Sequence, residues 1–107
     1  MSVTFFNKRT QVTNLRPTAQ ELKLGEIYLN YSDQTPGLFY EDESGSVIKI
    51  GPAQVSATAP NYTPAAGGSS GNSKGEIWYD TTNSVLKLWD GSQWRQPINT
   101  QFDSGTY

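Results

Sequence analysis

The chain has 107 residues, a formal net charge of −2, and neither cysteine nor histidine. Thiol nucleophiles, disulfides, zinc fingers and imidazole acid–base catalysis are therefore excluded. Hydrophobic residues make up only 35%, but 12% of all residues are aromatic, which favours a small ordered core over a disordered chain. No apolar run is long enough to span a membrane, and the slightly acidic balance argues against a general nucleic-acid binder.

The N-terminal arm, residues 1–23, precedes the first clear pattern. Residues 2–6 are predicted to form an edge strand. The segment 16–22 is predicted to form one helical turn, because Thr18 can cap it and Glu21 follows three residues later, as in a capping box.

An internal duplication is the most informative feature of the sequence. Residues 24–30 (LGEIYLN) return as residues 74–80 (KGEIWYD), with further matches downstream of both segments. Apolar and polar residues alternate with period two, which is typical of strands. Each copy therefore predicts three short strands, at residues 25–31, 37–42 and 46–50 in the first copy and at residues 76–80, 85–89 and 93–96 in the second.

These patterns predict an all-β fold with two small antiparallel three-stranded meander modules. Module 1 spans 24–52 and module 2 spans 75–97, followed by an extended tail, 98–107. Residues 53–74 between the modules are rich in Ala, Gly, Ser and Pro, which predicts an extended linker. Two interpretations of this linker stay open: a simple tether, or an arm that crosses to a neighbouring subunit.

A three-stranded sheet of this size is marginal in water. The two sheets are therefore expected to cover each other or to cover sheets of other chains, which predicts a role in protein–protein assembly. The residues expected to pack in the core or in an interface are Ile27, Leu29, Phe39, Tyr40, Ile48, Ile77, Trp78, Leu86, Leu88, Trp89 and Trp94.

The sequence offers little chemistry for catalysis. The carboxylates of Asp33 and of residues 41–43 lack the spacing of a calcium loop and are expected to be solvated. We expect no enzymatic activity, catalytic residue, metal or cofactor. One binding alternative remains, in which exposed coplanar rings of Trp78, Tyr79 and Trp94 form a platform that stacks on glycans.

The first copy, continued through 36–42 and 45–52, resembles a β-module of tail-fibre and related virion proteins of tailed bacteriophages, closest to versions from phages of cyanobacteria. The second copy, 75–94, is similar to another module of such proteins. The resemblance covers about half of the chain. It implies a virion component, assembled in the host cytoplasm, with a trimer as the favoured oligomer.

The chain departs from the fibre pattern because it has no long heptad shaft and no separate receptor-binding head. We therefore expect a non-enzymatic structural protein: a capsid decoration or cement protein, or a small tail- or fibre-associated component. Its partners would be other copies of itself and major capsid or tail proteins, without nucleic acid or membrane. The alternative is a host-surface adhesin that binds glycan through the aromatic residues of module 2.

Overall fold

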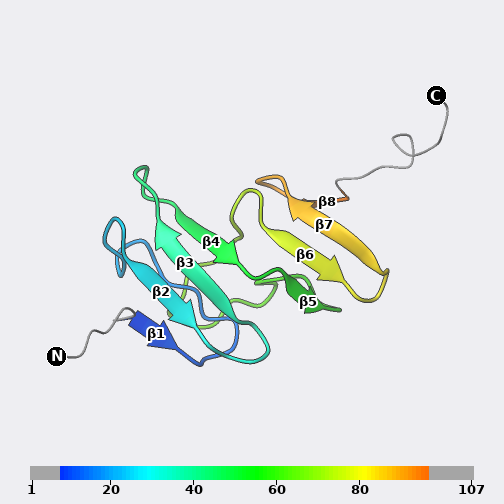
Figure 1. The fold of residues 1–107 in the computed structure, drawn as a ribbon, viewed down its shortest axis with the longest axis horizontal. Helices are drawn as coiled ribbons and strands as arrows, with labels where there is room; N and C mark the ends of the chain where they lie inside the picture. Colours follow the sequence, from blue (N-terminus) through cyan, green and yellow to red (C-terminus); the bar gives the residue numbers. More distant parts are fainter. Residues whose placement is uncertain (1–7, 97–107) are drawn as a thin grey trace.

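The computed structural model describes residues 8–96, which form an all-β structure of eight strands in two four-stranded sheets (Figure 1). The six strands predicted for the two copies are confirmed. The first sheet contains β1 (Lys8–Thr10), β2 (Ile27–Asn30), β3 (Gly37–Glu41) and β4 (Val47–Gly51), and the second contains β5 (Gln54–Ser56), β6 (Ile77–Asp80), β7 (Val85–Trp89) and β8 (Trp94–Arg95).

Both sheets have the same connectivity. The first strand of each sheet pairs parallel with the second, and the remaining neighbours pair antiparallel, in the order β1-β2-β3-β4 and β5-β6-β7-β8. The expected three-stranded modules are thus incomplete, because each sheet has a fourth strand, β1 or β5, at its edge. These strands are three residues long, too short to give a period-two signal in the sequence.

The expectation of an extended linker at residues 53–74 is wrong. This range contains β5 and most of the crossover from β5 to β6, residues 57–76. Parallel neighbours need a connection of a dozen or more residues, and the long segment meets that requirement.

The crossover packs closely against the first half of the chain. The Ser69 N–H donates to the carbonyl oxygen of Arg16 at 3.0 Å. A Cβ on Gly68 would lie 2.7 Å from Leu15 Cδ1 and 2.8 Å from the Arg16 oxygen, so only glycine fits there. Because Pro60 and Asn61 are also buried, the segment is a packed part of the fold and its small residues permit close approach.

The predicted helical turn at residues 16–22 is a β-turn instead. The Glu21 N–H donates to the Thr18 carbonyl oxygen at 3.1 Å, and Glu21 Oε1 accepts from the Thr18 N–H at 2.9 Å. The capping contact is thus present, but no helix follows because the chain turns again to enter β2. The predicted edge strand at residues 2–6 and the tail 98–107 lie outside the described residues.

The hydrophobic core lies on one face of the first sheet. Tyr28 and Phe39 are direct cross-strand neighbours in β2 and β3, and Leu22 from the crossover 11–26 packs on them, with Val47 at the margin. Burial raises the pKa of the Tyr28 phenol, and the nearby Glu21 adds to this effect. The crossover 11–26 therefore closes this face of the sheet.

The duplicated Gly-Glu dipeptide forms the same turn before β2 and before β6. Gly25 and Gly75 adopt φ values of +82° and +93°, which the third position of a type II turn requires and glycine adopts without strain. The following glutamate then bends back: Glu26 Oε1 accepts from the Lys23 N–H, and Glu76 Oε1 from the Ser73 N–H, each at 3.0 Å. The motif is therefore a turn that positions the strand behind it.

Candidate functional site

The face of the first sheet opposite the core is apolar. Side chains alternate between the two faces of a strand, so residues next to the core residues Tyr28 and Phe39 point to the opposite side. Cross-strand register places five large apolar side chains on this side, all partly buried: Ile27, Leu29, Leu38, Tyr40 and Ile48.

The second sheet repeats this arrangement. Trp78 is buried on one face, and its neighbours Ile77 and Tyr79 point to the other face with Leu86 and Leu88 opposite them. The edge strand adds Val55, which pairs with Tyr79. Val55 and Leu86 are 67% and 46% exposed, so this face meets solvent directly.

The two apolar faces meet between the sheets. Ile50 and Ile77 line one groove of about 140 Å³ together with Pro52 and Ala53. Strand contacts run mainly between neighbours within each sheet, so the sheets do not stack face to face. We call the combined surface the open face; its residues are Ile27, Leu29, Leu38, Tyr40, Ile48, Ile50, Val55, Ile77, Tyr79, Leu86 and Leu88.

The structure divides the predicted packing residues into two groups. Phe39 and Trp78 are buried as expected, and Trp89 and Trp94 pack on each other. Leu86 is exposed and does not pack within the described residues. The remaining members lie on the open face and are only partly buried, because aliphatic residues alternate with the core aromatic residues: Ile27, Leu29, Tyr40, Ile48, Ile77 and Leu88.

The expected glycan-stacking platform in module 2 is not formed. Trp78 is only 6% exposed, and its indole N–H donates to the Ser56 carbonyl oxygen at 3.0 Å. Trp94 meets the rings of Trp78 and Trp89 edge to face, at 64° and 65°, while Tyr79 points to the other side of β6. The rings pack against one another, and no coplanar surface results.

A buried ion pair joins the two halves of the chain. Arg16 Nη1 donates to Glu76 Oε1 at 2.8 Å and Nη2 to Oε2 at 2.5 Å, and both side chains are buried. The Arg16 guanidinium also lies 5.4 Å from the centre of the Phe39 ring. Because Arg16 lies in the crossover between β1 and β2 and Glu76 directly precedes β6, this pair sets how the halves sit together.

Lys49 and Ser73 extend this contact. The Lys49 N–H donates to Ser73 Oγ at 2.8 Å, and the same hydroxyl donates to the Val47 carbonyl oxygen at 3.3 Å. Burial lowers the pKa of the Lys49 amine, and the neighbouring Arg16 guanidinium acts in the same direction against the opposing charge of Glu76. This contact therefore connects β4 to the turn before β6.

Three aspartates organise turns at the strand ends. Hydrogen bonds hold the pKa of each carboxyl below its usual range: from the Ser46 N–H to Asp42, from the Asn83 side chain to Asp80, and from the Arg95 guanidinium to Asp90. A carboxyl with a depressed folded-state pKa stabilises the fold above its unfolded pKa, near 3.9, and loses this contribution as pH falls through the folded value.

We therefore expect the urea midpoint to stay level between about pH 5 and pH 7 and to fall below about pH 4. Asp90→Asn removes one titrating carboxyl, so the urea midpoint should fall less steeply as the pH drops below about 4. Asp33→Asn, at an exposed turn position, serves as the control. An unchanged slope in Asp90→Asn would contradict the role of this carboxyl.

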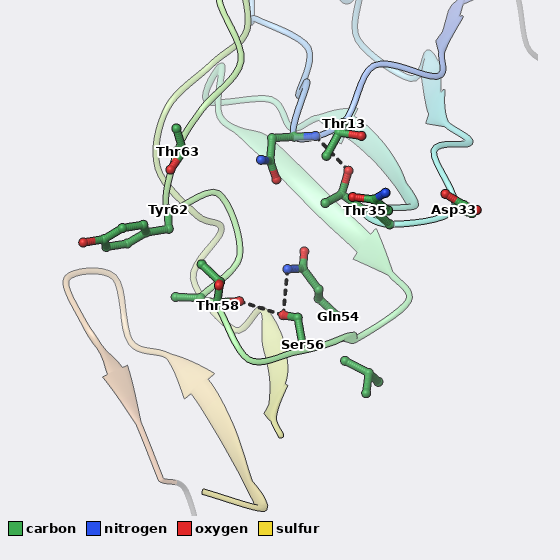
Figure 2. A pocket seen from close by; sticks show the side chains of 12 residues that line it. Thr13, Asp33, Thr35, Gln54, Ser56, Thr58, Tyr62 and Thr63 are labelled. Atoms are coloured by element: carbon green, nitrogen blue, oxygen red, sulfur yellow. Dashed lines mark hydrogen bonds between the residues drawn. The ribbon is translucent and has the colours of Figure 1, made fainter. Parts of the chain in front are cut away.

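A polar groove lies between the halves, next to β5 (Figure 2). It has a volume of about 470 Å³. One wall comes from loops of the first half and the other from the crossover 57–76, with β5 between them. Its lining residues are Thr13, Asn14, Asp33, Gln34, Thr35, Gln54, Val55, Ser56, Thr58, Ala59, Tyr62 and Thr63. Sequence reasoning missed this groove, because these residues come from three separate loop regions and share no motif.

Comparisons of the chain with protein-family models, curated proteins and solved structures find no match. The resemblance to phage fibre modules therefore stays a prediction from the sequence. Residues 8–96 contain no group of three or more acidic or metal-ligating side chains that could hold a metal ion. In the same range no helix is long and apolar enough to cross a membrane.

Proposed function

We propose that this chain is a non-enzymatic structural protein that assembles through its open face. The observation that carries the proposal is that eleven large apolar side chains share this face, and that three of them, Ile50, Val55 and Leu86, are 54%, 67% and 46% exposed. Monomeric proteins rarely leave contiguous apolar patches of more than a few hundred Å² in water.

The occupant we propose is a second copy of the chain. The charged strand residues on this face are Arg9 and Arg95, near its outer edges on β1 and β8. Lys49 and Glu76 also line the groove between the sheets, and Glu76 is paired with Arg16. Two such faces can approach without burying an unpaired carboxylate, and sheet faces pack on each other at about 10 Å. Eleven apolar residues would supply the centre of an interface of about 20–30 residues a side.

The sequence resemblance supports a place for this assembly in a bacteriophage virion. The proposed role is capsid decoration or cement, or a small component of the tail or fibre, in which sheet packing fixes neighbouring copies. Copy number per particle, measured by quantitative mass spectrometry of purified virions, distinguishes these locations. Hundreds of copies indicate the head, whereas a few dozen or fewer indicate the tail.

Analytical ultracentrifugation of the full chain over a concentration series tests assembly. The wild type is expected to form a discrete oligomer at micromolar concentration. Two open faces packed on each other give a dimer, whereas the trimer that the sequence resemblance implies needs three such faces around one axis. Leu86→Lys and Ile48→Lys place a charge in the open face of each sheet and should weaken association by at least about tenfold, because the charge would be desolvated in the interface.

Ala66→Lys is the matched control, because residue 66 is exposed in the crossover 57–76. It should leave association unchanged. A wild type that stays monomeric across the series, or a Leu86→Lys variant that still assembles with normal affinity, would contradict the proposal.

A further inference from the structure

The polar groove between the two halves has the chemistry of a binding site for uncharged sugars. Its lining carries a single carboxylate, that of Asp33, and no lysine or arginine. An anionic ligand such as a phosphate would find no countercharge there, and a strictly apolar ligand would leave the lining groups without partners. We propose that this groove binds a neutral oligosaccharide.

The lining matches the hydrogen-bonding pattern of sugar hydroxyls. Six hydroxyl side chains, that of Tyr62 included, and three amide side chains line the groove, and both kinds of group donate as well as accept. A sugar hydroxyl also does both, so a polyhydroxyl ligand satisfies such a mixed array. The volume of about 470 Å³ lies within the range of ligand sites.

Several of these groups are held in place without a ligand. Thr35 Oγ1 accepts from the Asn14 N–H at 2.8 Å, and Asn14 has a φ of +67°. On the groove floor, Gln54 Nε2 donates to Ser56 Oγ at 2.9 Å, and this hydroxyl donates to the Thr58 carbonyl oxygen at 2.6 Å (Figure 2). Such preorganisation lowers the entropic cost of binding.

An exposed aromatic ring stands beside the polar groups. Tyr62 is 76% exposed and comes from the rim of the crossover wall, with its ring pointing away from Gln54 and from Asp33 on the opposite wall (Figure 2). A sugar ring is amphipathic, with C–H groups on its faces that pack on an aromatic ring and hydroxyls at its edge. Because the exposed side chain is free to rotate, Tyr62 can swing over one sugar face at the rim while the polar groups contact the edge of the sugar.

A second groove continues the first. It has a volume of about 420 Å³ and shares Thr13 and Asp33 with the first groove. Its lining includes Tyr31, whose ring is 51% exposed. Two exposed tyrosines thus border one continuous polar surface, and this extent fits a chain of sugar units better than a monosaccharide.

The inference does not rest on the proposed assembly. Gln54 and Ser56 point to the face of β5 opposite Val55, so the groove floor faces away from the open face. Val55 borders both regions and is left out of the test for that reason. Loss of assembly in an open-face variant and loss of sugar binding in a groove variant are separately measurable.

The test is a two-dimensional NMR titration of the full chain with maltotriose, cellotriose and chitotriose, each up to about 10 mM, with sialyllactose as an acidic comparison. At least one neutral trisaccharide should shift the amide signals of groove residues, among them Asn14, Thr58 and Tyr62. Tyr62→Ala should weaken its binding at least about fivefold, through loss of ring contact. Asp33→Asn should weaken it as well, because a carboxylate accepts stronger hydrogen bonds than an amide.

Tyr62→Phe keeps the ring and should retain binding. Leu24→Ala and Glu43→Gln, at exposed positions outside the groove, should bind as the wild type does. The set of amide signals that a sugar shifts in the wild-type protein tests the proposal even if a variant fails to fold. The proposal is overturned if no neutral trisaccharide shifts groove signals, if Tyr62→Ala binds normally, or if sialyllactose binds as tightly as the best neutral sugar.

Discussion

Glu76→Gln is expected to destabilise the fold by about 3–5 kcal/mol. The substitution keeps an acceptor for the Ser73 N–H but leaves the buried Arg16 guanidinium without its countercharge. Because a whole domain is stable by only about 5–15 kcal/mol, much of the cooperative unfolding transition should disappear. Urea denaturation followed by tryptophan fluorescence measures the effect.

Removal of both charges together separates the cost of an unpaired buried charge from the cost of lost side-chain packing. Arg16→Met combined with Glu76→Leu should recover most of the lost stability, since apolar residues of similar size often replace a buried ion pair without loss. Arg95→Ala breaks an ion pair that is largely exposed and should have a much smaller effect. If Glu76→Gln melts like the wild type, the Arg16–Glu76 pair does not stabilise the arrangement of the two halves.

Phe39→Ala should also cost about 3–5 kcal/mol, because Phe39 belongs to the buried cluster of the first sheet. Its neighbour Tyr40 lies on the open face, and Tyr40→Ala should cost the monomer only about 1 kcal/mol. Denaturation at concentrations below the association range measures both variants.

The same two variants should rank in the opposite order for self-association. Tyr40→Ala removes a ring from the proposed interface, whereas folded Phe39→Ala molecules keep their open face. Sedimentation of both variants at matched folded fractions checks this reversal. Equal stability losses for the two variants would mean that the first sheet is covered on both faces.

The sequence predicts the strands well because their period-two pattern and their turn residues agree. Asp90 and Gly91 lie in the turn between β7 and β8, and Pro36 directly precedes β3, which begins at Gly37. The sequence pattern does not predict which face of each sheet forms the core. Alternation shows that Ile27 and Tyr28 point to opposite faces, but it does not show which of the two faces the crossover covers.

The crossover 57–76 could not be recognised from composition. Glycine- and serine-rich segments are typical of flexible linkers, but here Gly68 is required by close backbone contact and Asn61 bridges the loop by donating to the carbonyl oxygens of Ser69 and Gly71. Such contacts depend on where Arg16 lies in space, which no local pattern encodes. The polar groove escaped prediction for the same reason.

The Arg16–Glu76 pair constrains whether one half of this chain can be combined with another protein. Glu26 holds the corresponding turn position before β2, yet of these two glutamates only Glu76 pairs with an arginine. A second half transplanted into another protein would carry an acid that needs a new cation, and a first half alone would keep a buried guanidinium without an anion. The two similar segments are therefore not interchangeable, and each half depends on the other for its charge partner.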